Sequence, residues 1–211
     1  CFDQNPRVMP IGWTGSESLT RTSVAIGTRQ TLADVSRKVI SIHPPWHEGQ
    51  VGTAWVEYPL DLPAKQPISL CFENGVTATG TGDGVTFRVR VASFDLSEGE
   101  LGEIVFERHS ADKQWRKGEV DLSRFAGQQV RLQLESHPGP RNNTAFDQSY
   151  WAEPTLIAGT PPAPKPLPPP VTSNLPQLGE LNLASGAYRV YLQPGARGLL
   201  DADIGFVSPD S

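Results

Sequence analysis

A run of ten residues, 161–170, contains seven prolines and divides the chain into two unequal parts. Prolines supply no backbone N–H donors, so this run cannot build a core and should form an extended polyproline II rod about 30 Å long, at roughly 3.1 Å per residue. The part after the rod is close to the size below which a chain rarely folds alone. We therefore predict four segments: an extended N-terminal tether (1–34), a folded domain (35–159), a Pro-rich linker (160–178) and a C-terminal strap or hairpin (179–211).

Short strands follow one another through the folded segment. From Val85 to Val91, apolar and polar residues alternate with the period of two that is typical of a half-buried strand. Similar alternation or short β-branched runs mark further strands at 39–42, 54–60, 68–72, 103–108, 115–122, 130–135 and 155–158. No segment shows the period of 3.6 residues expected of an amphipathic helix. These patterns predict an all-β fold, an antiparallel two-sheet jelly-roll β-sandwich.

The charge and hydropathy of the chain exclude some classes of partner. The formal net charge is −5, which gives no electrostatic reason to expect nucleic acid as a ligand. No stretch approaches the roughly 20 apolar residues that a membrane-spanning helix needs. We expect no nucleic-acid partner and no spanning helix.

The first residue is Cys1, and the only methionine is Met9. A chain of this kind resembles a mature bacterial lipoprotein, whose N-terminal cysteine carries acyl chains after the signal peptide is removed. Several acyl chains would hold the protein at a membrane surface. The resemblance predicts lipidation of Cys1 and a location in the bacterial periplasm or at the cell surface; an internal cleavage site is the alternative. The remaining cysteine, Cys71, would then be a lone thiol in a strand.

Several motifs between residues 39 and 157 resemble the galactose-binding-like jelly rolls related to carbohydrate-binding modules of glycosidases. They are His43-Pro44-Pro45-Trp46, Trp55-Val56-Glu57-Tyr58, Gly82-Asp83-Gly84-Val85-Thr86-Phe87-Arg88-Val89, Val120-Asp121-Leu122-Ser123, Ala126-Gly127-Gln128, Pro138-Gly139-Pro140, Asn142-Asn143-Thr144-Ala145-Phe146-Asp147 and Tyr150-Trp151. The resemblance covers a little over half of the chain and implies the fold more specifically than the activity, because fold does not determine function.

Asp83 is a candidate ligand for a hard cation, because loop carboxylates and carbonyls suit calcium. Asn143 and Asp147, near the last strands of the sandwich, are candidates of the same kind. Each of the three could equally be a turn residue that caps its own backbone. The resemblance implies a structural calcium. The four histidines show no zinc-binding spacing, since Pro44 and Pro45 exclude a helix between His43 and His47, and we expect them at strand ends and turns.

Nothing in the chain singles out a catalytic group. There is no nucleophile elbow and no phosphate-binding loop. The carboxylates that could form a glycosidase pair show no distinguishing spacing; they are Glu57, Glu73, Asp83, Asp147 and Glu153. We expect a protein that is not an enzyme.

Two of the five tryptophans are candidates for a ligand or partner surface. Exposed aromatic rings stack on sugars and also anchor protein interfaces. Trp46, in a loop after two prolines, is the best candidate for exposure, and Trp13 is the second. The alternative for Trp46 is a plug over the end of the sandwich. Trp55 and Trp115 fall in predicted strands.

Two functions compete at this stage. The first is a non-catalytic, lipid-anchored accessory subunit of a larger envelope or membrane complex, of the respiratory or photosynthetic kind. Its proline rod pre-sets an extended shape and lowers the entropy lost on binding. The apolar residues of the strap would then bury against the other subunits; they are Leu167, Leu175, Leu178, Leu181 and Leu183. The strap could instead pack on its own domain. The second function is a cell-surface carbohydrate-binding module with a glycan as its ligand.

Overall fold

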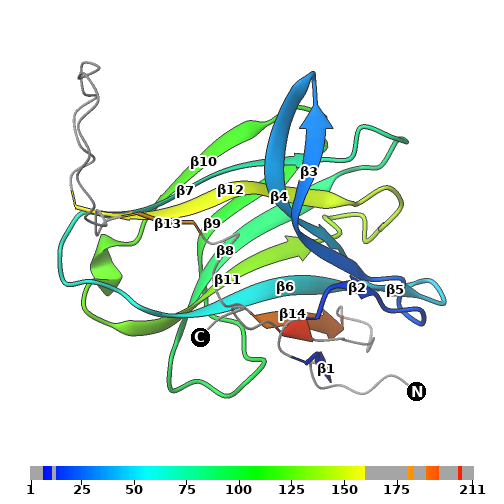
Figure 1. Cartoon of the computed structure of the whole chain (residues 1–211). Coiled ribbons are helices and arrows are strands. Elements are labelled where there is room, and N and C mark those ends of the chain that lie inside the picture. The colour runs from blue at the N-terminus through cyan, green and yellow to red at the C-terminus, as the bar shows by residue number, and fades with distance from the viewer. Residues whose placement is uncertain (1–6, 11–12, 160–179, 183–188, 195–203, 206–211) are drawn as a thin grey trace.

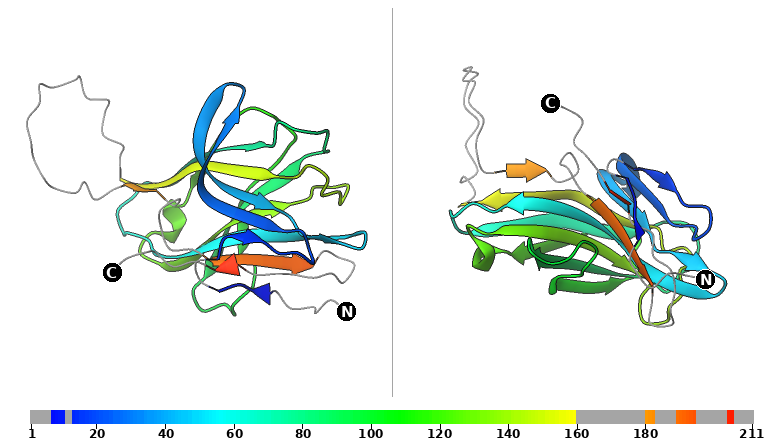
Figure 2. Two further views of the ribbon diagram at one scale, coloured as in Figure 1. Left: turned by 45° about the vertical axis from the view of Figure 1, so that its right-hand side comes forward. Right: turned by 90° about the horizontal axis from the view of Figure 1, so that it is seen from below.

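The computed structural model describes residues 7–10, 13–159, 180–182, 189–194 and 204–205. Two antiparallel β-sheets face each other as two layers, which confirms the predicted all-β sandwich (Figures 1 and 2). The described residues contain no helix long and apolar enough to cross a membrane. Cys1 lies outside the described residues, so its lipidation stays a prediction. The same holds for four of the strap leucines, namely Leu167, Leu175, Leu178 and Leu183.

Sheet A has two long strands, β6 (Gln50–Asp61) and β11 (Gln129–His137), at its centre. In spatial order its strands are β1 (Arg7–Val8), β14 (Arg189–Pro194), β6, β11, β8 (Val85–Ser93) and β9 (Glu103–Ser110). Two short strands attach to it, with β15 (Ile204–Gly205) on β14 and β5 (Trp46–His47) on β6.

Sheet B forms the opposite layer. In spatial order its strands are β10 (Arg116–Asp121), β7 (Ile68–Val76), β12 (Ser149–Ala158), β4 (Val35–His43), β3 (Ser23–Leu32) and β2 (Gly15–Ser16), and β13 (Glu180–Asn182) pairs with β12. A single 3₁₀ turn, η1 (Ser123–Phe125), links β10 to β11. From β4 to β12 the chain passes repeatedly between the two sheets, so neighbours in space are seldom neighbours in sequence.

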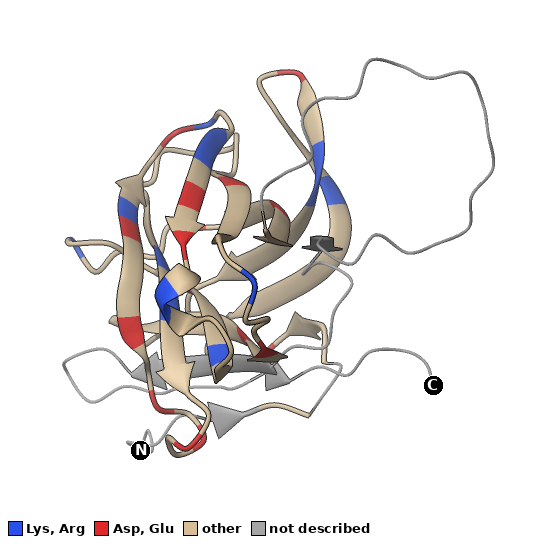
Figure 3. Cartoon of the chain, turned by 90° about the vertical axis from the view of Figure 1, so that its left-hand side faces the viewer, with Lys and Arg blue, Asp and Glu red and all other residues tan. Residues whose placement is uncertain are grey.

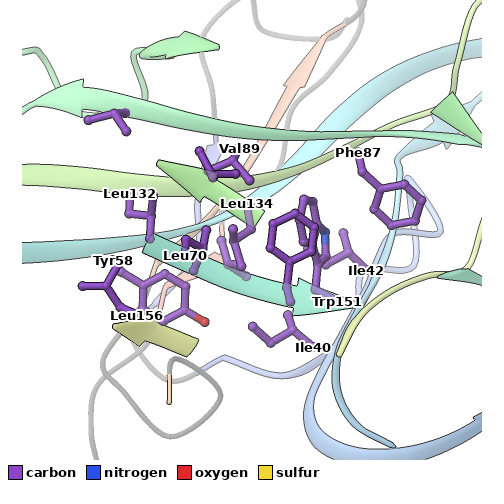
Figure 4. Close-up of a cluster of buried hydrophobic side chains, with 14 of the residues drawn as sticks. Ile40, Ile42, Tyr58, Leu70, Phe87, Val89, Leu132, Leu134, Trp151 and Leu156 are labelled. Atoms are coloured by element: carbon purple, nitrogen blue, oxygen red, sulfur yellow. The ribbon is translucent and has the colours of Figure 1, made fainter. Parts of the chain in front are cut away.

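Inward-facing side chains from both sheets make the main core (Figure 4). In sheet A, Leu134 lies in register with Val56 on one side and Val89 on the other. In sheet B, Leu70 lies in register with Val120 on β10 and with Leu156 on β12. The alternation read from the sequence in these strands therefore marks the face that is buried.

Trp151, on β12, joins the two layers. Its ring centroid lies 5.0 Å from that of Phe72 on β7 and 5.3 Å from that of Phe87 on β8, across the sandwich. Its indole N–H donates to Ser136 Oγ on β11 at 3.3 Å. The side chain is completely buried, so this single residue contacts both sheets through its ring and its polar atom.

The outer face of sheet A carries buried charged groups rather than exposed ones. Glu135 is 1% exposed and accepts hydrogen bonds from Arg88 (3.1 Å), Arg90 (2.5 Å) and Thr53 (2.9 Å). Charges of both signs are thus interleaved along neighbouring strands, as Figure 3 shows for the whole chain. Glu135 is matched by its guanidinium neighbours, which a buried carboxylate requires.

The loop between β8 and β9 covers this face. Arg131 donates to the carbonyls of Leu96 (2.7 Å) and Ser97 (3.0 Å), and Gln133 donates to the carbonyl of Glu100 (2.9 Å). Side chains of β11 therefore satisfy the backbone of the loop, and the loop shields them from water.

The N-terminal boundary differs from the prediction. Residues 23–32, which we placed in the extended tether, form β3 and pair along most of β4. Val24 is buried and Ile26 packs against the core, so the sandwich begins well before residue 35. The pattern was hard to read because Gly27, at φ +72°, interrupts the strand with a β-bulge between Ile26 and Thr28.

Parts of the predicted strap pair with the chain's own sheets. The backbone of Leu181, in β13, lies opposite Leu156, and β14 adds to sheet A beside β6. This agrees with the alternative that the strap lies on its own domain, at least for residues 180–182 and 189–194.

The core makes a direct stability prediction. Leu70 is completely buried between β10 and β12, so Leu70→Ala should lower the free energy of unfolding by about 2–5 kcal/mol through lost burial and the cavity left behind. Leu19, which is 48% exposed, provides the matched control: Leu19→Ala should change stability by less than about 0.5 kcal/mol. Urea unfolding followed by tryptophan fluorescence measures both, and equal effects would contradict this account of the core.

Candidate cation site

Two loops from opposite sheets meet at one end of the sandwich. Residues 77–84 lead into β8 of sheet A, and residues 138–148 lead into β12 of sheet B, both at the right of Figure 1. Asp83 lies at the end of the first loop and Asp147 at the end of the second. Residues that are 64 positions apart in the sequence (147 minus 83) are thereby brought together.

Both carboxylates are buried without hydrogen-bond partners. Asp147 has no exposed surface, and none of the four carboxylate oxygens of Asp83 and Asp147 has a partner among the described residues. Folded proteins rarely leave even one buried polar atom unsatisfied, because its desolvation then goes uncompensated. Two such carboxyl groups in one place indicate a ligand that supplies positive charge.

The electrostatics agree with this reading. Burial and, as the smaller cause, the nearby charge of Asp83 together raise the pKa of Asp147 to about 8. Like charges close together in a site that excludes water disfavour simultaneous ionisation unless a cation lies between them.

Glycines allow the two loops to approach closely. A Cβ atom at Gly82 would lie 2.6 Å from the carbonyl oxygen of Ala145 and 3.3 Å from Oδ1 of Asp147. At Gly80 a Cβ would lie 2.0 Å from the ring of Phe146, a residue whose own backbone is in the left-handed region at φ +64°. Such a conformation in a bulky residue costs free energy and persists only where the surroundings fix it.

Histidines fix the backbone of both loops. His109 Nε2 lies 3.0 Å from the carbonyl of Asp83, which can only accept, so Nε2 carries the proton and Nδ1 accepts from the Thr86 hydroxyl at 3.1 Å. His43 hydrogen-bonds to the backbone of Thr144, and burial lowers the pKa of His43. These are strand-end and turn roles, as the sequence predicted for the histidines.

The donor set fits a hard cation. Two carboxylates and adjacent backbone carbonyls, such as that of Ala145 beside Asp147, are oxygen ligands of the kind that calcium takes. Within the described residues no group of three or more His, Cys, Asp or Glu side chains could hold a metal, so an ion here would have two carboxylates as side-chain ligands and would take its other ligands from backbone carbonyls and water. Asp83 and Asp147 would hold the ion, and its charge would tie the two loops together.

Asn143, the third predicted ligand, has another role in this structure. Its Oδ1 accepts the backbone N–H of Ala145 at 3.0 Å, and the residue is exposed. It forms the local turn that presents the carbonyl of Ala145, as an asparagine in a loop often does.

The tryptophans are less exposed than the sequence suggested. Trp46, in β5, is half-buried, and the guanidinium of Arg21 lies 4.9 Å from its ring centre. Trp13 is partly buried and packs against the core. Trp55 is fully buried in β6. Trp46 is therefore partly exposed, and its role in binding a ligand or partner stays a prediction.

Comparison with known proteins gives one informative match. The chain is 30% identical over 139 residues to an uncharacterized protein of Archaeoglobus fulgidus, and the match covers 65% of this chain. It covers 35% of that protein, so the chain spans about a third of its relative's length. No protein-family model matches the chain.

The raised pKa of Asp147 predicts a pH dependence in chelator-treated protein. A group whose pKa is higher in the folded state contributes stability below its unfolded pKa of 3.8 and loses that contribution as the pH rises toward about 8. The wild-type protein should therefore lose stability relative to Asp147→Asn across this window, by at most about 1.4 kcal/mol per pH unit. Urea unfolding from pH 4 to pH 8 in EDTA measures the difference; parallel curves would contradict the assignment.

Proposed function

We propose that the chain is a non-catalytic carbohydrate-binding module of the galactose-binding-like kind, with its loop end stabilised by calcium. The observation that carries the proposal is the pair of buried carboxylates of Asp83 and Asp147. The family resemblance implied a structural calcium, and both residues were candidates for it. Their approach in space, without other partners among the described residues, is independent support.

The same pair argues against use as a glycosidase dyad. General acids and nucleophiles must reach a glycosidic bond, and water must reach the intermediate. The carboxylate oxygens of Asp83 and Asp147 are inaccessible, and Glu57 is 1% exposed beside Arg131 and Gln133. We therefore propose binding without catalysis.

The length of the relative supports a role for this chain as one domain of a larger protein. The match covers about a third of the Archaeoglobus protein, as expected when a sandwich domain is appended to other domains. The role as an accessory subunit stays a prediction, and so do the membrane anchor and the location. The accessory-subunit role loses some of its support because β13 and β14 pair with the chain's own sheets.

Calcium should stabilise the wild-type protein and not its carboxylate variants. An ion that binds only the folded state raises its stability by mass action, by about 2.7 kcal/mol at one hundred times the dissociation constant. Thermal unfolding with calcium and with EDTA should differ for the wild type and coincide for Asp83→Asn and Asp147→Asn. The control is Asp95→Asn, in an exposed loop, which should respond to calcium as the wild type does. A calcium effect that persists in Asp147→Asn would contradict the site.

The carbohydrate-binding function needs its own test. Calcium-loaded protein should bind a subset of glycans on an array of neutral and acidic saccharides, and isothermal titration should give a saturable affinity for the best of them. No binding to any glycan by protein that calcium stabilises would refute the function and leave the cation site intact.

A further inference from the structure

A groove of about 450 Å³ lies on the outer face of sheet B, where β2, β3, β4 and β12 meet. The β-bulge at Gly27 bends the β3–β4 hairpin, whose far end then packs over the face through Leu32 and Val39 against Tyr150. The volume falls within the range of about 300–1,000 Å³ that is usual for small-molecule sites.

The lining of the groove is polar but carries no charge. Its polar side chains are four hydroxyls and two carboxamides, in addition to the phenol of Tyr150, and they belong to Thr14, Ser16, Ser23, Ser41, Gln30 and Gln148. Hydroxyl and amide groups both donate and accept hydrogen bonds, as the hydroxyls of a sugar do. A carboxylate or ammonium ligand would find no opposite charge here to offset its desolvation.

Tyr150 gives the groove one aromatic wall. Its side chain is buried on the other side against Trp115, at a centroid distance of 6.2 Å, and Trp115 in turn donates its indole N–H to the carbonyl of Val35 at 2.8 Å. Tyr150 is only 6% exposed and belongs to the second core cluster, with Leu32 and Val39, so its ring is held in place and gives the groove a rigid border.

Gln148 is already oriented at the floor. Its Nε2 donates to Ser41 Oγ at 2.7 Å, and its Oε1 accepts from Ser23 Oγ at 3.2 Å. One N–H and one lone pair of the amide remain for a ligand. The side chains of Gln30 and Thr14 make no hydrogen bond with any described residue, so they can turn to a ligand without breaking a contact.

We propose that this groove binds an uncharged saccharide, whose hydroxyls would bond to the side-chain amides of Gln30 and Gln148 and to the hydroxyls of the lining. This inference rests on the proposed carbohydrate-binding function and adds the site and the ligand class. Neutral hexoses and their oligosaccharides are the expected ligands; uronic acids should bind more weakly, because none of the described residues that line the groove is cationic.

Nuclear magnetic resonance on the full, calcium-loaded chain tests the inference. Galactose, lactose, cellobiose and galacturonic acid serve as probes. A neutral sugar should shift the side-chain amide resonances of Gln30 and Gln148, and galacturonic acid should bind at least about tenfold more weakly. Gln30→Ala should weaken neutral-sugar binding about tenfold with little change in the melting temperature, since the Gln30 side chain makes no hydrogen bond with a described residue. Gln129→Ala, exposed at the start of β11, is the matched control and should bind as the wild type does.

The outcomes separate the site from the function. Array binding that survives both Gln30→Ala and Gln148→Ala would place the glycan elsewhere and overturn the groove, while the carbohydrate-binding function would stand. Equal binding of galacturonic acid would overturn the neutral ligand class. Amide shifts that are absent for every neutral probe would overturn the groove, and an empty glycan array would overturn the function as well.

Discussion

The burial of Trp151 between the two sheets fixes the strand on which both candidate sites depend. Ser149 has one hydroxyl proton, which it donates to the carbonyl of Ile42 at 2.7 Å. Ser136 must therefore donate to Ser149 at 2.7 Å, and it accepts from the indole of Trp151. This directed chain of hydrogen bonds joins β12 to β4 within sheet B and to β11 across the core. The start of β12 is consequently held on both faces, and the residues before it have a defined position.

Two kinds of buried carboxylate show how this protein treats charge. Glu135 is as deeply buried as Asp147, but three donors surround it, two of them guanidinium groups. Asp147 faces Asp83 instead, and neither carboxylate has a donor among the described residues. Both arrangements obey one rule, that a carboxylate leaves water only when positive charge or hydrogen bonds replace it. The chain supplies the replacement for Glu135, and we propose that an external cation supplies it for Asp147.

The sequence predicted the strands better than it predicted which strands and loops contact one another. Strands with a clear period of two, such as 85–91, were recognisable because burial of one face makes apolar and polar residues alternate along the sequence. β3 was missed because the bulge at Gly27 shifts the alternation by one residue halfway along the strand. Asp83 and Asp147 were recognisable as candidates from their turn context, but no local pattern states which loops meet. The groove was not foreseen, because Gln30 and Gln148 are ordinary residues that only the bent hairpin brings together.

The two sites are physically connected, because Asp147 and Gln148 are consecutive residues entering one strand. An ion held by Asp147 would restrain the backbone that positions the side-chain amide of Gln148. The backbone carbonyl of Gln148 also accepts the N–H of Thr77 in the opposite loop at 2.9 Å. Loop 77–84 is therefore tied to loop 138–148 twice, once by this hydrogen bond and once through the ion proposed between Asp83 and Asp147. If the ion has already ordered these loops, a saccharide that binds afterwards loses less conformational entropy. The proposed cation and saccharide would therefore favour each other's binding. Linkage makes this coupling reciprocal, whichever of the two binds first.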